Sequence, residues 1–107
     1  MEPTATVVVA RGEGSETEEF TGTGGGMVDA TFAALRKASG LDPHLLDYRV
    51  VPVTSGADAM AEVNVVIQID GMSRSGRAIS TDVVEGSGHA FVEALNRVLN
   101  AGAGTAA

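Results

Sequence analysis

The same order of sequence patterns occurs twice in this chain, and this repeat most limits the folds open to it. Each half has a β-branched apolar run, a glycine turn, a more polar run, a segment of small residues and a helical pattern. Residues 6–9 match residues 63–66, and residues 31–36 loosely match residues 90–95. Hairpins alternating with helices predict an α+β fold in which helices pack on antiparallel sheets.

The first half begins with a predicted hairpin. Residues 6–10 are short and β-branched, as is typical of a strand. A glycine turn at residues 12–15 follows, and residues 17–21 can return as a polar partner strand with Phe20 facing inward. We expect the glycines of residues 22–26 to break regular structure after this strand.

A helix is predicted next, over residues 27–39. Val28, Phe32 and Leu35 fall on one helical face. Gly40 fits the position just past the helix, where a left-handed residue is often needed.

The second half predicts three strands before its helix. The clearest alternation has Val63, Val65, Ile67 and Ile69 pointing one way. Pro52 favours an edge position for the strand that leads this half. We expect strands at residues 46–53, 61–70 and 75–80, joined by turns at residues 55–58 and 71–74.

The second predicted helix covers residues 82–99. Asp82 and Glu85 have the spacing of a capping pair at a helix start. Gly86 and Gly88 weaken a helix, so regular helix can also begin only at Ser87. The expected buried stripe consists of Phe91, Leu95, Val98 and Leu99, with Val84 and Ala94 contributing.

Length and charge exclude several classes of protein. The 107 residues fit a single domain, which we expect over residues 1–100, with residues 101–107 as a disordered tail. A net charge of −7 and a single lysine argue against binding to nucleic acid or to an anionic membrane surface. No apolar run approaches a membrane span and no secretory signal is seen, so a cytoplasmic location is expected.

Catalytic and cofactor motifs are also missing from the sequence. Lys37 is not preceded by the glycines of a phosphate-binding loop, and Met27 stands where a dinucleotide motif needs its last glycine. His44 and His89 lack metal-ligand spacing and are expected to be exposed. We therefore predict no catalytic residue, no metal and no cofactor.

The glycine segment before the first helix is the best candidate for a binding site. A helix start exposes backbone N–H groups and a positive dipole end, so a carboxylate can bind there without a basic side chain. The alternative is a flexible turn that needs glycine for its backbone angles.

Residues 24–30, Gly-Gly-Gly-Met-Val-Asp-Ala, resemble the Gly-Asn-Gly-Pro-Val-Asp-Ala segment of the alpha-isopropylmalate synthase family. The similarity is to its C-terminal regulatory domain, which citramalate synthases share. Four further segments agree in order, so that the resemblance covers roughly residues 5–99: residues 46–50, 56–63, 80–87 and 94–97.

This resemblance implies two βββα units with pseudo-twofold symmetry, whose antiparallel sheets pack on two helices; here the first unit lacks its leading strand. It also implies a homodimer that binds the pathway end-product, leucine or isoleucine, at the dimer interface. The catalytic barrel of about 250 residues, with its metal site, does not fit this length. The implied protein is a free-standing regulatory domain, not an enzyme, and it can act on a separately encoded synthase.

The resemblance further implies a site for a leucine zwitterion. Amides near Gly24 and Gly26 would donate to the carboxylate, and Asp82 or loop carbonyls would accept from the ammonium. The remaining implied ligand-binding residues are Val28, Asp29, Leu45, Tyr48, Pro52, Ala59 and Ala61. Each also has a structural explanation, because Asp29 and Asp82 can be helix-start acids and the others can simply pack.

Two residues depart from the family pattern in the loop that should meet the ligand. Met27 replaces the usual proline and Gly25 the usual asparagine. These departures leave an alternative open, a structural dimerisation or scaffold domain that has lost the ligand and acts through a protein partner. A small enzyme with a repurposed pocket is the third hypothesis.

Overall fold

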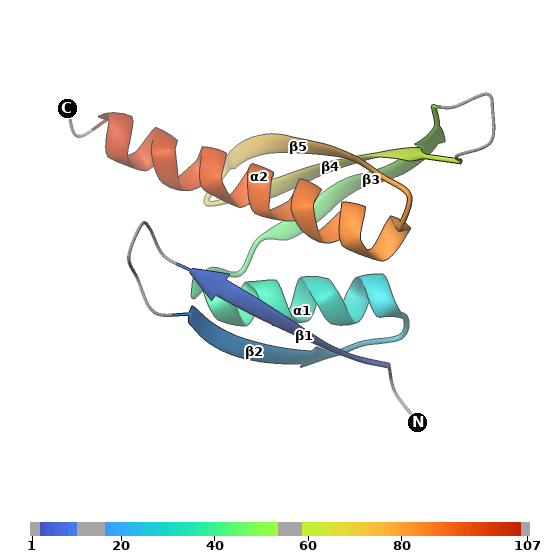
Figure 1. Cartoon of the computed structure of the whole chain (residues 1–107). Helices are drawn as coiled ribbons and strands as arrows, with labels where there is room; N and C mark the ends of the chain where they lie inside the picture. Colours follow the sequence, from blue (N-terminus) through green and yellow to red (C-terminus); the bar gives the residue numbers. More distant parts are fainter. Residues whose placement is uncertain (1–2, 11–16, 54–58, 106–107) are drawn as a thin grey trace. The chain divides into compact units, whose positions relative to one another are not determined.

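The computed structural model describes residues 3–10, 17–53 and 59–105, and Figure 1 shows their helices and strands. The chain divides into two compact units, Met1–Leu41 and Asp42–Ala107. Both units place a helix on an antiparallel sheet, which confirms the predicted α+β class. The elements are β1 (Thr4–Ala10), β2 (Thr17–Thr23), α1 (Met27–Ser39), β3 (His44–Pro52), β4 (Ala61–Ile69), β5 (Met72–Ser80) and α2 (Val83–Thr105).

The first unit is a two-stranded hairpin covered by α1. β1 and β2 pair antiparallel, and Val7 lies opposite Phe20. α1 has the predicted bounds and buries an alanine-rich face that includes Phe32 and Leu35. Gly40 ends the helix in the left-handed conformation (φ 69°), and its N–H donates to the carbonyls of the last turn, as expected.

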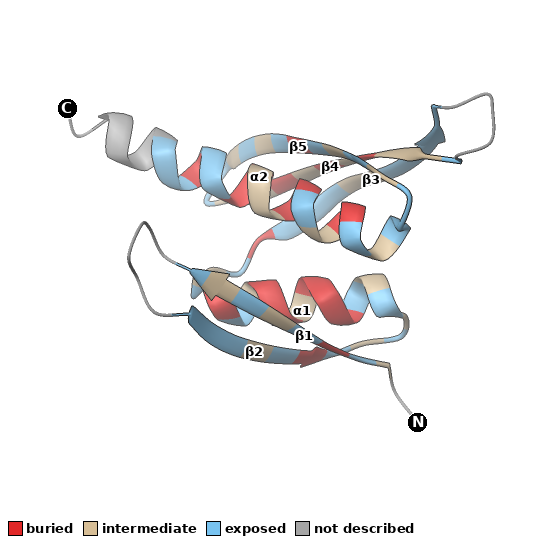
Figure 2. Ribbon diagram, viewed as in Figure 1, coloured by how far each residue is buried: buried red, intermediate tan, exposed pale blue. Residues whose placement is uncertain are grey.

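The second unit adds a third strand to the same plan. Its sheet has the order β3-β4-β5, so the predicted βββα unit with β3 at an edge is confirmed. The buried side of β4 consists of Val63, Val65 and Ile67, none of which is exposed. α2 packs on this side over β4 and β5, and Figure 2 shows buried residues along the helix. Phe91 and Ala94 are completely buried.

Two close approaches between a strand and a helix confirm that the second unit repeats the first. A Cβ on Gly22 of β2 would overlap the backbone of α1 at Ala30, and a Cβ on Gly76 of β5 would overlap that of α2 at Ala90. The equivalent helix positions are therefore Ala30 and Ala90, one residue away from the loose match proposed from the sequence. Both sites need glycine because a helix backbone occupies the space of a side chain.

The structure corrects some predicted bounds. Gly22 and Thr23 belong to β2 and do not interrupt it, since Gly22 makes the contact with α1. Residues 72–74 belong to β5, because the turn needs only Asp70 and Gly71. Leu99 is half exposed and does not belong to the core. The predicted turns at residues 12–15 and 55–58 lie outside the described residues.

Candidate functional site

The glycine loop before α1 has one glycine that the fold itself requires. The N–H of Gly24 donates to the carbonyl of Pro3 at 3.2 Å. A Cβ on Gly24 would lie 2.8 Å from the Cβ of Asp29 and 2.9 Å from the nitrogen of Ala30. Gly24 thus allows the loop to run close against the first turn of α1, and its amide is already hydrogen bonded.

Gly26 is the open position of this loop. It is the N-cap of α1, with an extended backbone (φ −150°), and no side chain caps the helix there. A Cβ on Gly26 would meet no atom within 4 Å. Val28 is half-buried and Asp29 is exposed in the first turn. The positive end of α1 is therefore accessible around Gly26.

The start of α2 provides a direct contrast. The Oδ1 atom of Asp82 accepts hydrogen bonds from the N–H groups of Val84 at 2.9 Å and Glu85 at 3.2 Å. Ser80 Oγ in turn accepts from the N–H of Asp82. Asp82 is thus the predicted N-cap, and a carboxylate of the protein itself occupies this helix start. The two units therefore have equivalent helix starts, and a carboxylate of the protein caps α2 but not α1.

β3 presents apolar side chains on the same side of the sheet as the core. Leu45 and Tyr48 pair with Ile67 and Val65, and Pro52 pairs with Ala61. Paired residues of an antiparallel sheet point to the same side. The structure thus brings four of the predicted pocket residues, Leu45, Tyr48, Pro52 and Ala61, to one side of β3 and β4.

α2 leaves most of the apolar side chains of β3 exposed. It packs on β4 and β5, whereas Leu45 is 37% and Val50 40% exposed. Ala59 is exposed just before β4, beside the hydrogen bond from the N–H of Val53 to the carbonyl of Met60. We name the apolar side chains of Leu45, Tyr48, Val50 and Pro52 the β3 apolar strip.

Tyr48 is held in place by a residue that the sequence analysis missed. Its hydroxyl lies 2.7 Å from Ser87 Oγ, and Ser87 is completely buried in α2. The bond ties the β3 apolar strip to the start of the helix. The sequence signal was weak, a serine between Gly86 and Gly88 where only small residues allow close packing.

The predicted site residues fall into two sets, one in each unit. Around the start of α1 lie Gly24, Gly26, Val28 and Asp29, and on the second unit lie Leu45, Tyr48, Pro52, Ala59, Ala61 and Asp82. The first set provides helix-end donors and the second an apolar surface with a carboxylate.

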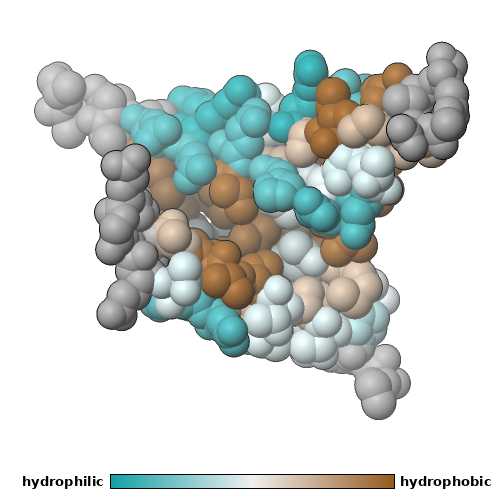
Figure 3. Space-filling view, in the orientation of Figure 1, coloured by the Kyte–Doolittle hydropathy of each residue, from teal (hydrophilic) through white to brown (hydrophobic). Residues whose placement is uncertain are grey.

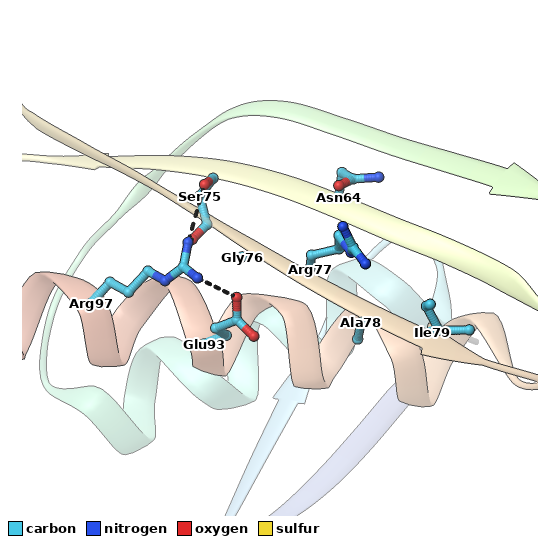
Figure 4. A pocket seen from close by; sticks show the side chains of 8 residues that line it. All are labelled: Asn64, Ser75, Gly76, Arg77, Ala78, Ile79, Glu93 and Arg97. Carbon is cyan, nitrogen blue, oxygen red and sulfur yellow. Dashed lines mark hydrogen bonds and ion pairs between the residues drawn. The ribbon is translucent and has the colours of Figure 1, made fainter.

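A groove beside β5 is a different kind of surface. It has a volume of about 610 Å³, and Figure 4 shows its lining from β4, β5 and α2. Arg97 lines one end of it, with an ion pair to Glu93 at 3.0 Å and hydrogen bonds to the carbonyl and hydroxyl of Ser75. The groove contains none of the predicted site residues.

Metal and membrane sites receive no support from the described residues. None of their His, Asp and Glu side chains form a group of three that could hold a metal ion. His44 is exposed at the start of β3, and His89 lies 3.6 Å from Glu85 on the outer side of α2. Figure 3 shows hydrophilic side chains following this outer side. Within the same residues, no helix combines the length and apolarity of a membrane crossing.

Comparison with known families then identifies the domain. A family model described as "LeuA allosteric (dimerisation) domain" matches residues 1–99. The chain belongs to this family. The open start of α1 and the β3 apolar strip are therefore features of a LeuA dimerisation domain.

Relatives of the chain are named 2-isopropylmalate synthase. The protein from Aquifex aeolicus is 46% identical over 100 residues, which cover 92% of this chain. Those from Shouchella clausii and Pyrococcus furiosus are 44% and 45% identical and cover 91% and 89% of it. In each case this chain spans only 19% of the relative's length. The similarity therefore concerns the LeuA dimerisation domain.

Proposed function

We propose that this domain binds leucine or a related branched-chain molecule at an interface between two copies, and so reports the level of that molecule to a synthase. The observation that carries the proposal is the β3 apolar strip, which contains predicted pocket residues and in which Leu45, Val50 and Pro52 are exposed. The family description and the names of the relatives support the regulatory role.

The start of α1 supplies the carboxylate site in this proposal. The α2 start shows a carboxylate accepting two first-turn N–H groups, at Asp82. Gly26 leaves the α1 start without a side-chain cap. The chain has seven Lys and Arg against fourteen Asp and Glu, which favours backbone donors at a helix end for binding an anion.

The predicted site residues of the second unit supply the apolar contacts to the ligand and an acceptor for its ammonium group. Leu45, Tyr48 and Pro52 would contact the branched side chain, and Ala59 and Ala61 are small enough to leave room for it. Burying four carbons contributes roughly 2–3 kcal/mol, whereas micromolar binding needs about 8 kcal/mol. Polar contacts must supply the difference, through the α1 amides and through Asp82 or loop carbonyls as acceptors for the ammonium.

A thermal-shift titration tests the proposal. Leucine, isoleucine, valine and their keto and hydroxy acids are titrated against the chain, with aspartate and lysine as controls. Ligand at 100 times its Kd adds about 2.7 kcal/mol of stability, which raises the Tm of a domain of this size by several degrees. We expect a selective, saturable rise for one branched-chain compound. A folded chain whose Tm ignores every compound contradicts ligand binding.

A scaffold without ligand is the second candidate. Met27 and Gly25 replace family residues in the loop that would meet the ligand, and Met27 is 45% exposed. On this account the chain dimerises and acts through a protein partner. In both accounts the domain performs no condensation itself, and a cytoplasmic location remains a prediction.

A further inference from the structure

The two edges of the three-stranded sheet differ in how they are protected. At the β5 edge, Arg97 reaches from α2 and donates to the carbonyl of Ser75 at 3.0 Å, as Figure 4 shows. A side chain on an edge carbonyl blocks the addition of another strand. β3 forms the opposite edge: among the described residues it pairs with β4 alone, with a shift of register between Leu45 and Asp47.

β3 has the composition of a strand that another chain covers. Figure 2 shows it mostly in the exposed colour, and Leu46 is 53% and Val51 42% exposed. Together with Leu45 and Val50, these residues place apolar side chains on both faces of an edge strand. Soluble proteins normally protect long apolar edges, because such edges pair with other chains.

The charged residues of β3 indicate that the strand pairing with this edge is β3 of a second copy. Asp47 and Arg49 lie two residues apart on the polar face, with 3.1 Å between the carboxylate and the guanidinium. Tyr48 lies between them. In an antiparallel pair with a twofold axis at Tyr48, Asp47 of each copy lies opposite Arg49 of the other. Because the pairing is isologous, it forms two such pairs between opposite charges, one on each side of the axis.

We propose that β3 pairs antiparallel with β3 of a second copy, about a twofold axis at Tyr48, so that the two sheets form one six-stranded sheet. This inference rests on the dimer of the proposed function and places its interface. The pairing brings the two β3 apolar strips side by side, and with them the proposed ligand residues Leu45, Tyr48 and Pro52. It thereby gives a route by which ligand binding can change the strength of dimerisation.

Charge reversal tests the register directly. Asp47→Arg alone and Arg49→Asp alone each create two like-charge pairs in the homodimer. We expect each to raise the dimer Kd, measured by sedimentation equilibrium, at least about tenfold, because two unfavourable cross-strand pairs act together. A mixture of the two variants restores complementary charges, so we expect a heterodimer with nearly the original Kd. The double variant Asp47→Arg/Arg49→Asp is expected to dimerise like the original chain.

Matched controls and a cross-link complete the test. Glu19→Arg and Arg77→Asp make the same charge changes on other exposed strand positions and should leave the Kd unchanged. The chain has no cysteine. A mixture of Asp47→Cys and Arg49→Cys chains should therefore form a disulfide between different variants faster than between identical ones.

The outcomes separate this inference from the proposed function. If charge reversal leaves the dimer Kd unchanged and no mixed disulfide is preferred, the β3 pairing is wrong. Ligand binding at another interface is still possible in that case. A chain that stays monomeric overturns both the pairing and the interface site. Circular dichroism of each variant distinguishes lost dimerisation from lost folding.

Discussion

Gly76→Ala is expected to destabilise the second unit by about 3 kcal/mol. The new Cβ would overlap the carbonyl oxygen of Ala90 and lie 2.8 Å from the nitrogen of Ala94. These are backbone atoms of α2, which cannot change rotamer as a side chain can. The helix must therefore move away from β5. Overpacking of a core commonly costs 1–3 kcal/mol, and a backbone obstacle belongs at the upper end of that range.

Urea unfolding followed by circular dichroism measures this effect. Ser73→Ala, on an exposed position of the same strand, is the control and should change the free energy of unfolding by less than about 0.5 kcal/mol. Gly22→Ala, at the equivalent contact with α1, should show the same kind of loss. A Gly76→Ala variant within about 1 kcal/mol of the original chain would contradict the packing described here.

Gly26→Asp is expected to change stability and ligand binding in opposite directions. The backbone at Gly26 is extended and its surroundings are open, so an aspartate fits. Its carboxylate can cap α1 as Asp82 caps α2, which should raise the free energy of unfolding by about 0.5 kcal/mol. The same carboxylate occupies the amides proposed for leucine. Losing two charge-assisted hydrogen bonds of about 1.5 kcal/mol each weakens leucine binding roughly a hundredfold.

Two further variants separate capping from charge. Gly26→Ser provides a cap without a charge and should also weaken leucine binding. Gly25→Asp adds the same charge one residue earlier, where a Cβ has ordinary contact with Asp29 and no capping position. Isothermal titration calorimetry and thermal unfolding give both readouts. If Gly26→Asp binds leucine as well as the original chain, the carboxylate is not held at the α1 start.

Local signals in the sequence were sufficient for much of the fold. The bounds of α1 follow from periodic apolar residues and from Gly40, and the Asp82 cap follows from its position before an apolar run. The alternation of Val63, Val65 and Ile67 placed the buried face of β4 correctly. These features depend on residues close together in the chain, where periodicity and capping rules apply.

Long-range packing was not predictable in the same way. Gly22 was assigned to a break because glycine is common in turns, whereas it lies in β2 against α1. Leu99 continues the helical stripe, but its side chain is half exposed. The bond between Tyr48 and Ser87 joins residues 39 positions apart. The exposure of the β3 apolar strip likewise depends on where α2 crosses the sheet, and no local sequence pattern specifies that position.

The same limit applies to the candidate site. The glycine loop was found because a helix start has recognisable chemistry, yet only the structure separates Gly24, whose amide is hydrogen bonded, from the open Gly26. The pocket residues of β3 and β4 were implied by family resemblance. The structure adds that Leu45, Tyr48, Pro52 and Ala61 share one side of the sheet.

The most direct test of the account is the dimer Kd of this chain, measured by sedimentation equilibrium with and without leucine. A ligand held at the interface between two copies binds the dimer more tightly than the monomer, so it must strengthen dimerisation. We predict that saturating leucine lowers the dimer Kd at least about tenfold, whereas an equal concentration of aspartate does not. A dimer Kd that is the same with and without leucine would contradict the central claim.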